Sequence, residues 1–159
     1  MIIVSIAVVA VALSIYFSQG RSPASDPASG ANTATVQGGD IVISKAELDD
    51  NAAFFSYQSG DVTMELLAFR AGDGSIRTAF NTCAVCYDSG LGYYVQEGDM
   101  LVCQNCGNRY PAERVGVDVG GCNPIPIFAT DRIEDTDTIT IPADFIEQYT
   151  GYFLRWEKP

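Results

Sequence analysis

The sequence predicts a mainly β protein, a small antiparallel β domain with two cysteine knuckles, preceded by one long apolar α-helix at the N-terminus. Three observations lead to this fold class. After residue 40, short segments rich in β-branched and aromatic residues alternate with Gly-Asp turns. All five cysteines lie between residues 83 and 122. An apolar stretch over residues 2–17 is interrupted only by Ser5, Ser14 and Tyr16.

Residues 1–18 are expected to form the apolar helix. About 17 residues extend roughly 26 Å as a helix, near the lower limit for crossing a bilayer. The basic region of a secretory signal is missing from it. Two interpretations stay open: a plain membrane anchor, or a filament-core helix, because an apolar helix that starts at the first residue resembles a processed type IV pilin-like subunit. Ser5 departs from the bacterial pilin pattern, which has a glutamate there.

Residues 19–39 are rich in Ser, Pro, Ala, Gly and Thr, which predicts a flexible linker, because such a segment buries too little apolar surface to fold alone. Residues 40–159 then form the β-rich, cysteine-cluster, metal-binding domain. Nine basic residues against twenty acidic ones give a net charge of −11, which argues against nucleic acid or anionic lipid as a partner. The chain has no histidine, which excludes a histidine base, a His-held haem and His-ligated zinc or copper.

Within this domain, residues 44–47 carry a capping-box signature for a brief helical turn. Hairpins are expected at Gly60-Asp61 and around residues 97–99. The segment 139–146 echoes 41–48, which indicates two similar strand–turn elements paired in one sheet, or else a chance similarity. Residues 149–156 form a last strand or a packed tail. The expected strands cover residues 41–43, 53–59, 62–70, 75–80, 93–96, 100–102 and 139–141.

The two Cys-x-x-Cys pairs are separated by sixteen residues, a spacing typical of four-thiolate metal sites. Three alternatives stay open. A structural zinc site would use the two pairs alone and leave Cys122 unexplained. An iron–sulfur cluster would take Cys122 as a ligand or close neighbour, since Gly120 and Gly121 let the backbone approach a bulky inorganic core and Asn123-Pro124 stiffens the exit. Two disulfides and one free thiol form the third alternative.

Several segments together resemble one family, that of predicted Fe–S-containing membrane proteins of uncharacterised function. The resemblance covers about residues 40–147 and rests on Asn81-Thr82-Cys83-Ala84-Val85-Cys86-Tyr87, residues 92–96, residues 100–107 and Gly120-Gly121-Cys122-Asn123-Pro124, with residues 73–80 matching its style. It implies an extracytoplasmic, metal-carrying domain, in relatives often associated with iron permeases. Relatives often have several membrane spans, whereas this chain offers one apolar segment. The resemblance carries over, as metal-site residues, Cys83, Cys86, Cys103, Cys106 and Cys122.

These observations predict an extracytoplasmic iron–sulfur protein for electron transfer or iron-linked redox, displayed on a membrane anchor or as a pilin-like filament subunit. Its expected partners are the membrane or other copies of itself, through the N-terminal helix, and redox or iron-transport proteins, but not nucleic acid. The alternatives are a zinc-stapled surface or adhesive filament protein and a copper or iron metallochaperone. An enzyme is not expected, because no nucleophile–base pair is visible and the acidic residues are scattered.

Overall fold

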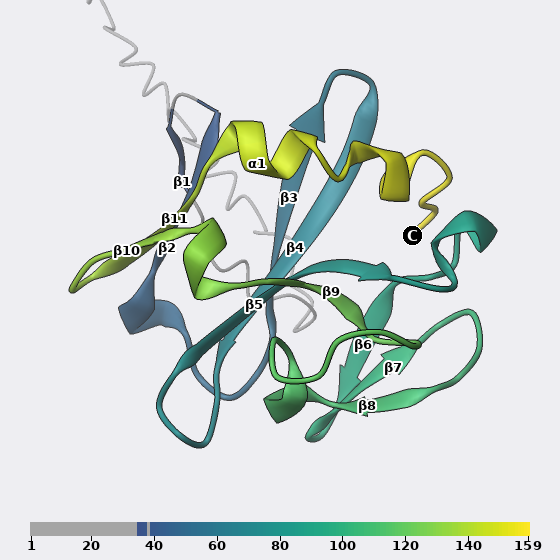
Figure 1. Ribbon diagram of the computed structural model, residues 1–159, viewed down its shortest axis with the longest axis horizontal. Helices are drawn as coiled ribbons and strands as arrows, with labels where there is room; N and C mark the ends of the chain where they lie inside the picture. Colours follow the sequence, from purple (N-terminus) through teal and green to yellow (C-terminus); the bar gives the residue numbers. More distant parts are fainter. Residues whose placement is uncertain (1–34, 38) are drawn as a thin grey trace, which may run out of the picture.

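The computed structural model describes residues 35–37 and 39–159. The predicted helix over residues 1–18 and most of the predicted linker lie outside the described residues. Among the residues that are described, no helix is long and apolar enough to cross a membrane. The structure confirms a mainly β domain, built from three antiparallel sheets (Figure 1).

The central sheet has the strand order β3-β4-β5-β9 and separates the other two sheets. It consists of β3 (Ala53–Ser59), β4 (Val62–Arg70), β5 (Ile76–Cys83) and β9 (Pro124–Ile127). The first sheet has the order β1-β2-β11-β10 and consists of β1 (Thr35–Gln37), β2 (Asp40–Ser44), β11 (Thr138–Ile141) and β10 (Ile133–Glu134). The knuckle sheet contains β6 (Tyr94–Glu97), β7 (Met100–Cys103) and β8 (Arg109–Pro111).

Both faces of the central sheet are covered, which explains the apolar character of its middle strands. Side chains alternate between the two faces of a strand. On β4, Leu66 therefore faces the core shared with the first sheet, and Leu67 faces the core shared with the knuckle sheet. Both are fully buried. Truncation of either to alanine would cost about 2–5 kcal/mol, the usual range for a buried leucine.

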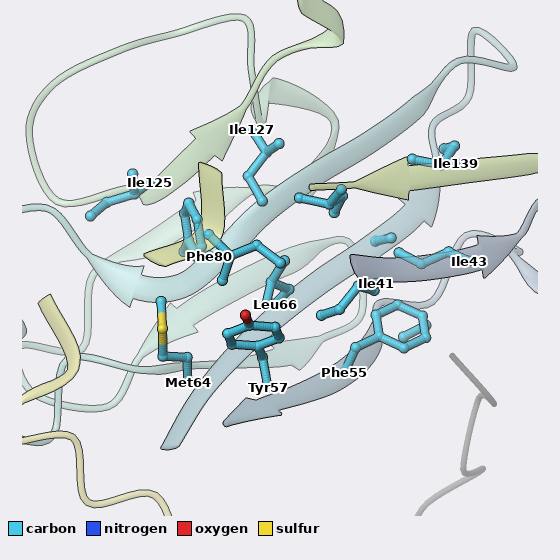
Figure 2. Packing of buried hydrophobic residues seen from close by; sticks show 14 of the residues in the cluster. Ile41, Ile43, Phe55, Tyr57, Met64, Leu66, Phe80, Ile125, Ile127 and Ile139 are labelled. Atoms are coloured by element: carbon cyan, nitrogen blue, oxygen red, sulfur yellow. The ribbon is translucent and has the colours of Figure 1, made fainter. Parts of the chain in front are cut away.

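The larger core lies between the central sheet, the first sheet and the C-terminal segment (Figure 2). Ile41 and Ile43 of β2 enter it beside Ile139 and Ile141 of β11. β2 and β11 pair antiparallel, with Ile41 opposite Ile141 and Ile43 opposite Ile139. The two similar strand–turn elements predicted from the sequence thus do pair in one sheet.

Each of these two strands runs into a short helical segment. After β2 comes a 3₁₀ turn at Lys45–Glu47, where the Ser44 side chain makes no capping hydrogen bond, so the turn forms without the predicted capping box. After β11 comes α1 (Ala143–Glu147), whose Ile146 is buried in the larger core. The remaining 3₁₀ turns are Tyr87–Ser89, Ala112–Arg114, Ala129–Asp131 and Thr150–Phe153.

β1 pairs with β2 and extends the folded domain five residues before its predicted start at residue 40. At the other end, the predicted last strand or packed tail is a packed tail, with a 3₁₀ turn at Thr150–Phe153. The Tyr149 ring stacks on Phe80, with 4.4 Å between ring centroids. The Trp156 indole N–H donates to the Asn81 carbonyl at 3.0 Å. The tail therefore closes over the end of β5 that carries the first cysteine.

Candidate metal centre

Two strand ends and one loop supply the five cysteines. Cys83 is the last residue of β5 and Cys103 the last of β7. Both are fully buried in the smaller core, between the central and knuckle sheets. Each begins a turn that brings back a second cysteine, Cys86 or Cys106, nearer the surface. Cys122 comes from the loop that precedes β9 and is half-buried.

The sulfur atoms converge. Those of four cysteines lie within 4.8 Å of one another, namely Cys83, Cys86, Cys103 and Cys122. The sulfur of the exposed Cys106 is 3.1 Å from that of Cys122, and Cys83 is 3.2 Å from Cys122 on its other side. A disulfide bond measures about 2.05 Å, and all five cysteines are free. The structure thus brings all five predicted site residues together and does not show the alternative of two disulfides.

The two knuckles aim backbone N–H groups at sulfur in the same way. The Cys83 sulfur accepts from the amides two and three positions later, those of Val85 and Cys86. The Cys103 sulfur likewise accepts from the amides of Asn105 and Cys106. Hydrogen bonds of this kind favour the thiolate form that binds metal. The Cys-x-x-Cys spacing produces this geometry because the chain must turn back within four residues.

A glycine helps to hold each knuckle, for a different reason. Gly107 follows the second knuckle with a φ of +72° and donates to the Cys103 carbonyl at 2.8 Å. The first knuckle has Tyr87 at the matching position, and a 3₁₀ turn follows. Its support is Gly92, whose carbonyl accepts from the Cys83 N–H at 2.7 Å. A Cβ at Gly92 would lie 2.8 Å from the Cys86 backbone, so a larger residue would push the knuckle away.

The third loop is tied to both knuckles. The Asn108 side chain donates to the Cys122 carbonyl at 2.8 Å, and the Ala84 N–H donates to the Asn123 carbonyl at 3.2 Å. Gly120 and Gly121 both have positive φ values, +86° and +82°. A Cβ at either position would meet open space, so their backbone conformation, and not close approach to another part of the protein, calls for glycine.

The environments of the thiols differ strongly. The hydrogen bond with Cys122 and the Asn108 amide lower the pKa of the exposed Cys106 to about 7. Burial raises the pKa of Cys103 to about 12 and also raises the pKa of Cys122. Burial opposes ionisation of Cys83 as well, but the hydrogen bonds from Tyr94 and the backbone amides outweigh it and lower its pKa. Metal binding, which requires thiolates, would therefore release protons from the buried cysteines.

Tyr94 is the one tyrosine whose hydroxyl reaches the described sulfurs, at 3.7 Å from Cys122. Its side chain is fully buried, and burial raises its pKa, so the hydroxyl stays protonated and can donate to thiolate. Asn81 fixes its backbone: the Tyr94 N–H donates to the Asn81 side chain at 2.7 Å. Sequence reasoning missed this hydrogen bond. Tyr87 and Tyr93 pack against Tyr152 and Trp156.

The donor set fits iron–sulfur chemistry. Every convergent ligand atom is a thiolate sulfur, and four thiolates suffice for a two-iron or four-iron cluster. Soft thiolates also suit zinc and Cu(I), whose affinity for sulfur is high. Four sulfurs bound to one tetrahedral ion, each about 2.3 Å from it, lie about 3.8 Å from one another. The four cysteine sulfurs here lie within 4.8 Å of one another, which is close to that distance. The residues present therefore fit a thiolate-bound metal centre.

Comparison with known proteins agrees with this chemistry. Residues 48–153 match a family described as membrane iron-sulfur containing protein, FtrD-like. The matched region contains all five cysteines, both knuckles and the loop of Cys122. Searches of curated proteins and of solved structures found no match to the chain.

Proposed function

Because the chain belongs to the FtrD-like family of membrane iron-sulfur containing proteins, we propose that it is a one-electron carrier at the outer face of a membrane. The observation that carries this proposal is the convergence of sulfur atoms from three separate loops. When bound, an iron–sulfur centre would supply reversible one-electron chemistry. The residues proposed to hold it are Cys83, Cys86, Cys103 and Cys122, with Cys106 at its edge.

The chain's own hydrogen-bond donors would set the reduction potential. Hydrogen bonds to sulfur raise the potential, because the reduced centre carries more negative charge. Tyr94 and the paired backbone amides of the two knuckles all donate to sulfur or lie within reach of it. Asn81 keeps Tyr94 in place from the neighbouring strand. These residues therefore position donors and do not themselves react.

The exposure of the cysteines suits electron exchange with a partner. Cys83 and Cys103 form the buried side, whereas Cys106 is exposed and Cys122 half-buried. A partner could therefore approach the centre from the Cys106 side. Two cavities among the described residues, of about 950 and 360 Å³, are lined by no cysteine.

The segment over residues 1–18 would tether this domain. The family's description as a membrane protein supports an anchor. In this proposal the cysteine domain lies on the extracytoplasmic side. Packing of the same segments from several copies into a pilin-like filament is the second arrangement. Fractionation of native membranes and electron microscopy of the cell surface distinguish the two.

The test is an elemental and optical analysis of full-length protein purified without oxygen in a mild detergent. We expect iron, acid-labile sulfide and visible absorbance that bleaches with dithionite. Cys83→Ser should lose the colour, whereas the matched control Ser56→Ala, an exposed residue on β3, should keep it. Stoichiometric zinc without iron would overturn the proposal.

A structural zinc site is the second candidate, and the compact sulfur spacing favours it. It predicts a colourless protein that unfolds when a chelator removes the metal. The adjacent exposed thiol of Cys106 supports a third candidate, a metallochaperone that hands copper or iron to a partner. Metal exchange with a chelator within minutes, without unfolding, would favour this candidate.

A further inference from the structure

A second feature lies at the opposite end of β5 from the cysteines. A cavity of about 950 Å³ opens between the end of β2, the start of β5 and the segment that joins β9 to β10. Four of the nine basic residues of the chain line it, against two acidic ones, Glu134 and Asp137. Its wall thus has a formal charge of +2 in a protein with a net charge of −11. The four basic residues are Lys45, Arg70, Arg77 and Arg132.

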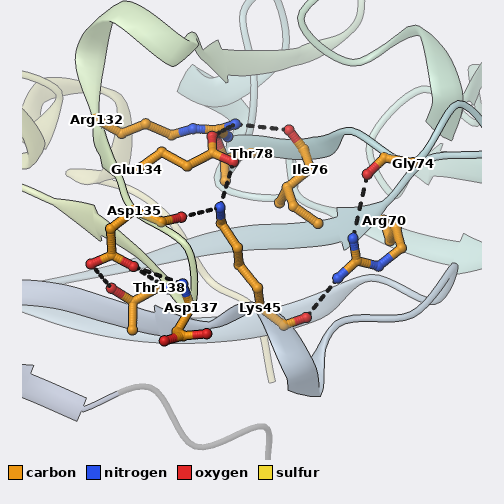
Figure 3. Close-up of polar contacts among 10 residues, drawn as sticks. All are labelled: Lys45, Arg70, Gly74, Ile76, Thr78, Arg132, Glu134, Asp135, Asp137 and Thr138. Atoms are coloured by element: carbon orange, nitrogen blue, oxygen red, sulfur yellow. Dashed lines mark hydrogen bonds and ion pairs between the residues drawn. The ribbon is translucent and has the colours of Figure 1, made fainter.

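Neutral groups hold the Arg70 guanidinium, and neutral groups together with the Glu134 carboxylate hold that of Arg132 (Figure 3). Arg70 donates to the carbonyls of Lys45 at 2.7 Å and of Gly74 at 3.4 Å. Arg132 donates to the Thr78 hydroxyl at 2.6 Å and to the Ile76 carbonyl at 2.9 Å. Carbonyls and hydroxyls fix a guanidinium in place but leave its charge uncompensated. The positive charge of Arg70 is therefore both positioned and available.

Two buried N–H groups in this wall have no acceptor. They are the Nε atoms of Arg77 and Arg132, two of the three buried polar side-chain atoms without a partner among the described residues. The Arg132 side chain is only 5% exposed. Its terminal nitrogen pairs with the Glu134 carboxylate at 3.0 Å, but its Nε has no acceptor in the described part of the chain. Buried donors nearly always have an acceptor in folded proteins. The wall therefore has donors and positive charge in excess of what the protein itself satisfies.

The floor of the cavity is apolar. Ile76 and Ile127 are buried there, and the half-exposed ring of Phe128 stands at the edge. Inorganic phosphate or sulfate would fill little of about 950 Å³ and would gain nothing from these side chains. An organic molecule with acidic groups matches both surfaces, because guanidinium groups pair with planar carboxylates and the floor packs against carbon.

We propose that this cavity binds a small organic molecule with two or more carboxylates. Arg70 and Arg77, which start on opposite faces of the central sheet but line the same cavity, each hold a carboxylate. A carboxylate of the ligand also competes with Glu134 for Lys45, and the apolar floor contacts the carbon chain. The site is distinct from the metal centre. The cavity lies near Ile76 at the start of β5 and Ile127 at the end of β9. The cysteine cluster lies at the other ends of the same two strands, near Cys83 and Pro124. The proposal therefore does not rest on the redox function.

The test is calorimetric titration of the full-length chain in detergent with citrate and succinate. Inorganic phosphate, sulfate and uncharged glycerol serve as comparison probes. We expect saturable binding of citrate or succinate that weakens as salt is added, no comparable binding of phosphate or sulfate, and none of glycerol. Binding of phosphate as tight as that of citrate would overturn the assignment to an organic ligand.

Arg77→Gln should weaken citrate binding at least tenfold. It is the safest variant, because among the described residues the only ion pair it breaks is with the exposed Asp73. Arg70→Gln should act likewise, and its circular dichroism melt shows whether the lost carbonyl contacts unfold it. The matched control is Arg109→Gln, an exposed arginine paired with Glu97 in the knuckle sheet. Unchanged affinity in Arg77→Gln, or no saturable binding of either carboxylate, would refute the proposal.

Discussion

Replacement of Asn81 by alanine tests how the two knuckles are held together. Asn81 is fully buried near the end of β5, two residues before Cys83. Its side chain donates to the Tyr94 carbonyl at 3.2 Å and to the Glu65 carboxylate at 2.7 Å, and accepts from the Tyr94 N–H at 2.7 Å. It thus joins the central sheet to β6 of the knuckle sheet. Asn81→Ala removes all three contacts at once.

The expected loss follows from these contacts. A hydrogen bond contributes about 1 kcal/mol net, and a buried group left without a partner costs about 1–3 kcal/mol. The Tyr94 N–H loses its acceptor, whereas Glu65 keeps its ion pair with Lys158 at 2.5 Å. We therefore expect Asn81→Ala to lower the free energy of unfolding by about 3–5 kcal/mol. Metal retention should fall too, because β5, which carries Cys83, loses its link to β6, the strand that pairs with β7 and Cys103.

Urea denaturation of the reduced chain, followed by circular dichroism and Trp156 fluorescence, measures the loss. Trp156 is a suitable probe because its indole donates to the Asn81 carbonyl. The matched control is Asn51→Ala, since Asn51 is exposed and, within the described part of the chain, its side chain forms hydrogen bonds only to Asp49 and Asp50. Its effect should stay within about 0.5 kcal/mol. A loss below about 1 kcal/mol in Asn81→Ala would refute this account of the link.

Three further predictions concern the metal centre. Cys122→Ser should lose the metal and Cys106→Ser should keep it, as measured by elemental analysis; the reverse result would assign the ligands to the two Cys-x-x-Cys pairs alone. Tyr94→Phe should lower the potential by about 40 mV in a redox titration, because losing about 1 kcal/mol at sulfur destabilises the reduced state; an unchanged potential would contradict this. In metal-free protein, iodoacetamide should modify Cys106 first, with a rate that rises through about pH 7, while Cys103, with a pKa of about 12, stays unmodified at pH 8 by peptide mass spectrometry.

Local sequence patterns predicted the strands that are bounded by clear turn residues. The hairpin of β3 and β4 has the predicted bounds, because Gly60-Asp61 separates two segments of clear alternation. The pairing of β2 with β11 spans almost the whole domain, yet the repeated Ile-x-Ile pattern indicated it. Such a pattern exposes one apolar face on each strand, and two apolar faces of the same spacing can share one core.

The strands that sequence reasoning missed depend on their neighbours. β9 contains Pro124 and Pro126, which argue against a strand, but it lies at an edge of the central sheet, where proline is tolerated. β8 and β10 are only three and two residues long and form because a longer strand offers free backbone groups beside them. β1 is a short segment at the end of a linker-like composition. The residue pattern of one short segment does not show which neighbouring strand it will pair with, so such strands cannot be predicted from it.

The sequence predicted that the sulfur atoms of the cysteines converge, but not which cysteines are buried and which lie at the surface. The spacing shows that the two knuckles can meet, whereas the position of Cys122 depends on the fold of the fifteen-residue connection from Cys106 and on the side chain of Asn108. Asn81 and Asn108 were missed, although each lies two residues from a knuckle cysteine. The basic cavity was missed for a different reason. Its four cations are scattered from residue 45 to residue 132 and share no motif.

The third loop determines what kind of site this is. With two knuckles alone, Cys106 would complete a closed set of four ligands, as a structural zinc site requires. The hydrogen bonds from Ala84 and Asn108 instead place Cys122 among the buried sulfurs and leave Cys106 exposed, 3.1 Å from it. If the four closely spaced cysteines are the ligands, as proposed, Cys106 is a fifth thiol at the solvent edge, which a purely structural site does not need. A centre that is assembled, exchanged or reached by a partner can use such a thiol. Metal retention in Cys106→Ser therefore separates these functions more sharply than the identity of the metal.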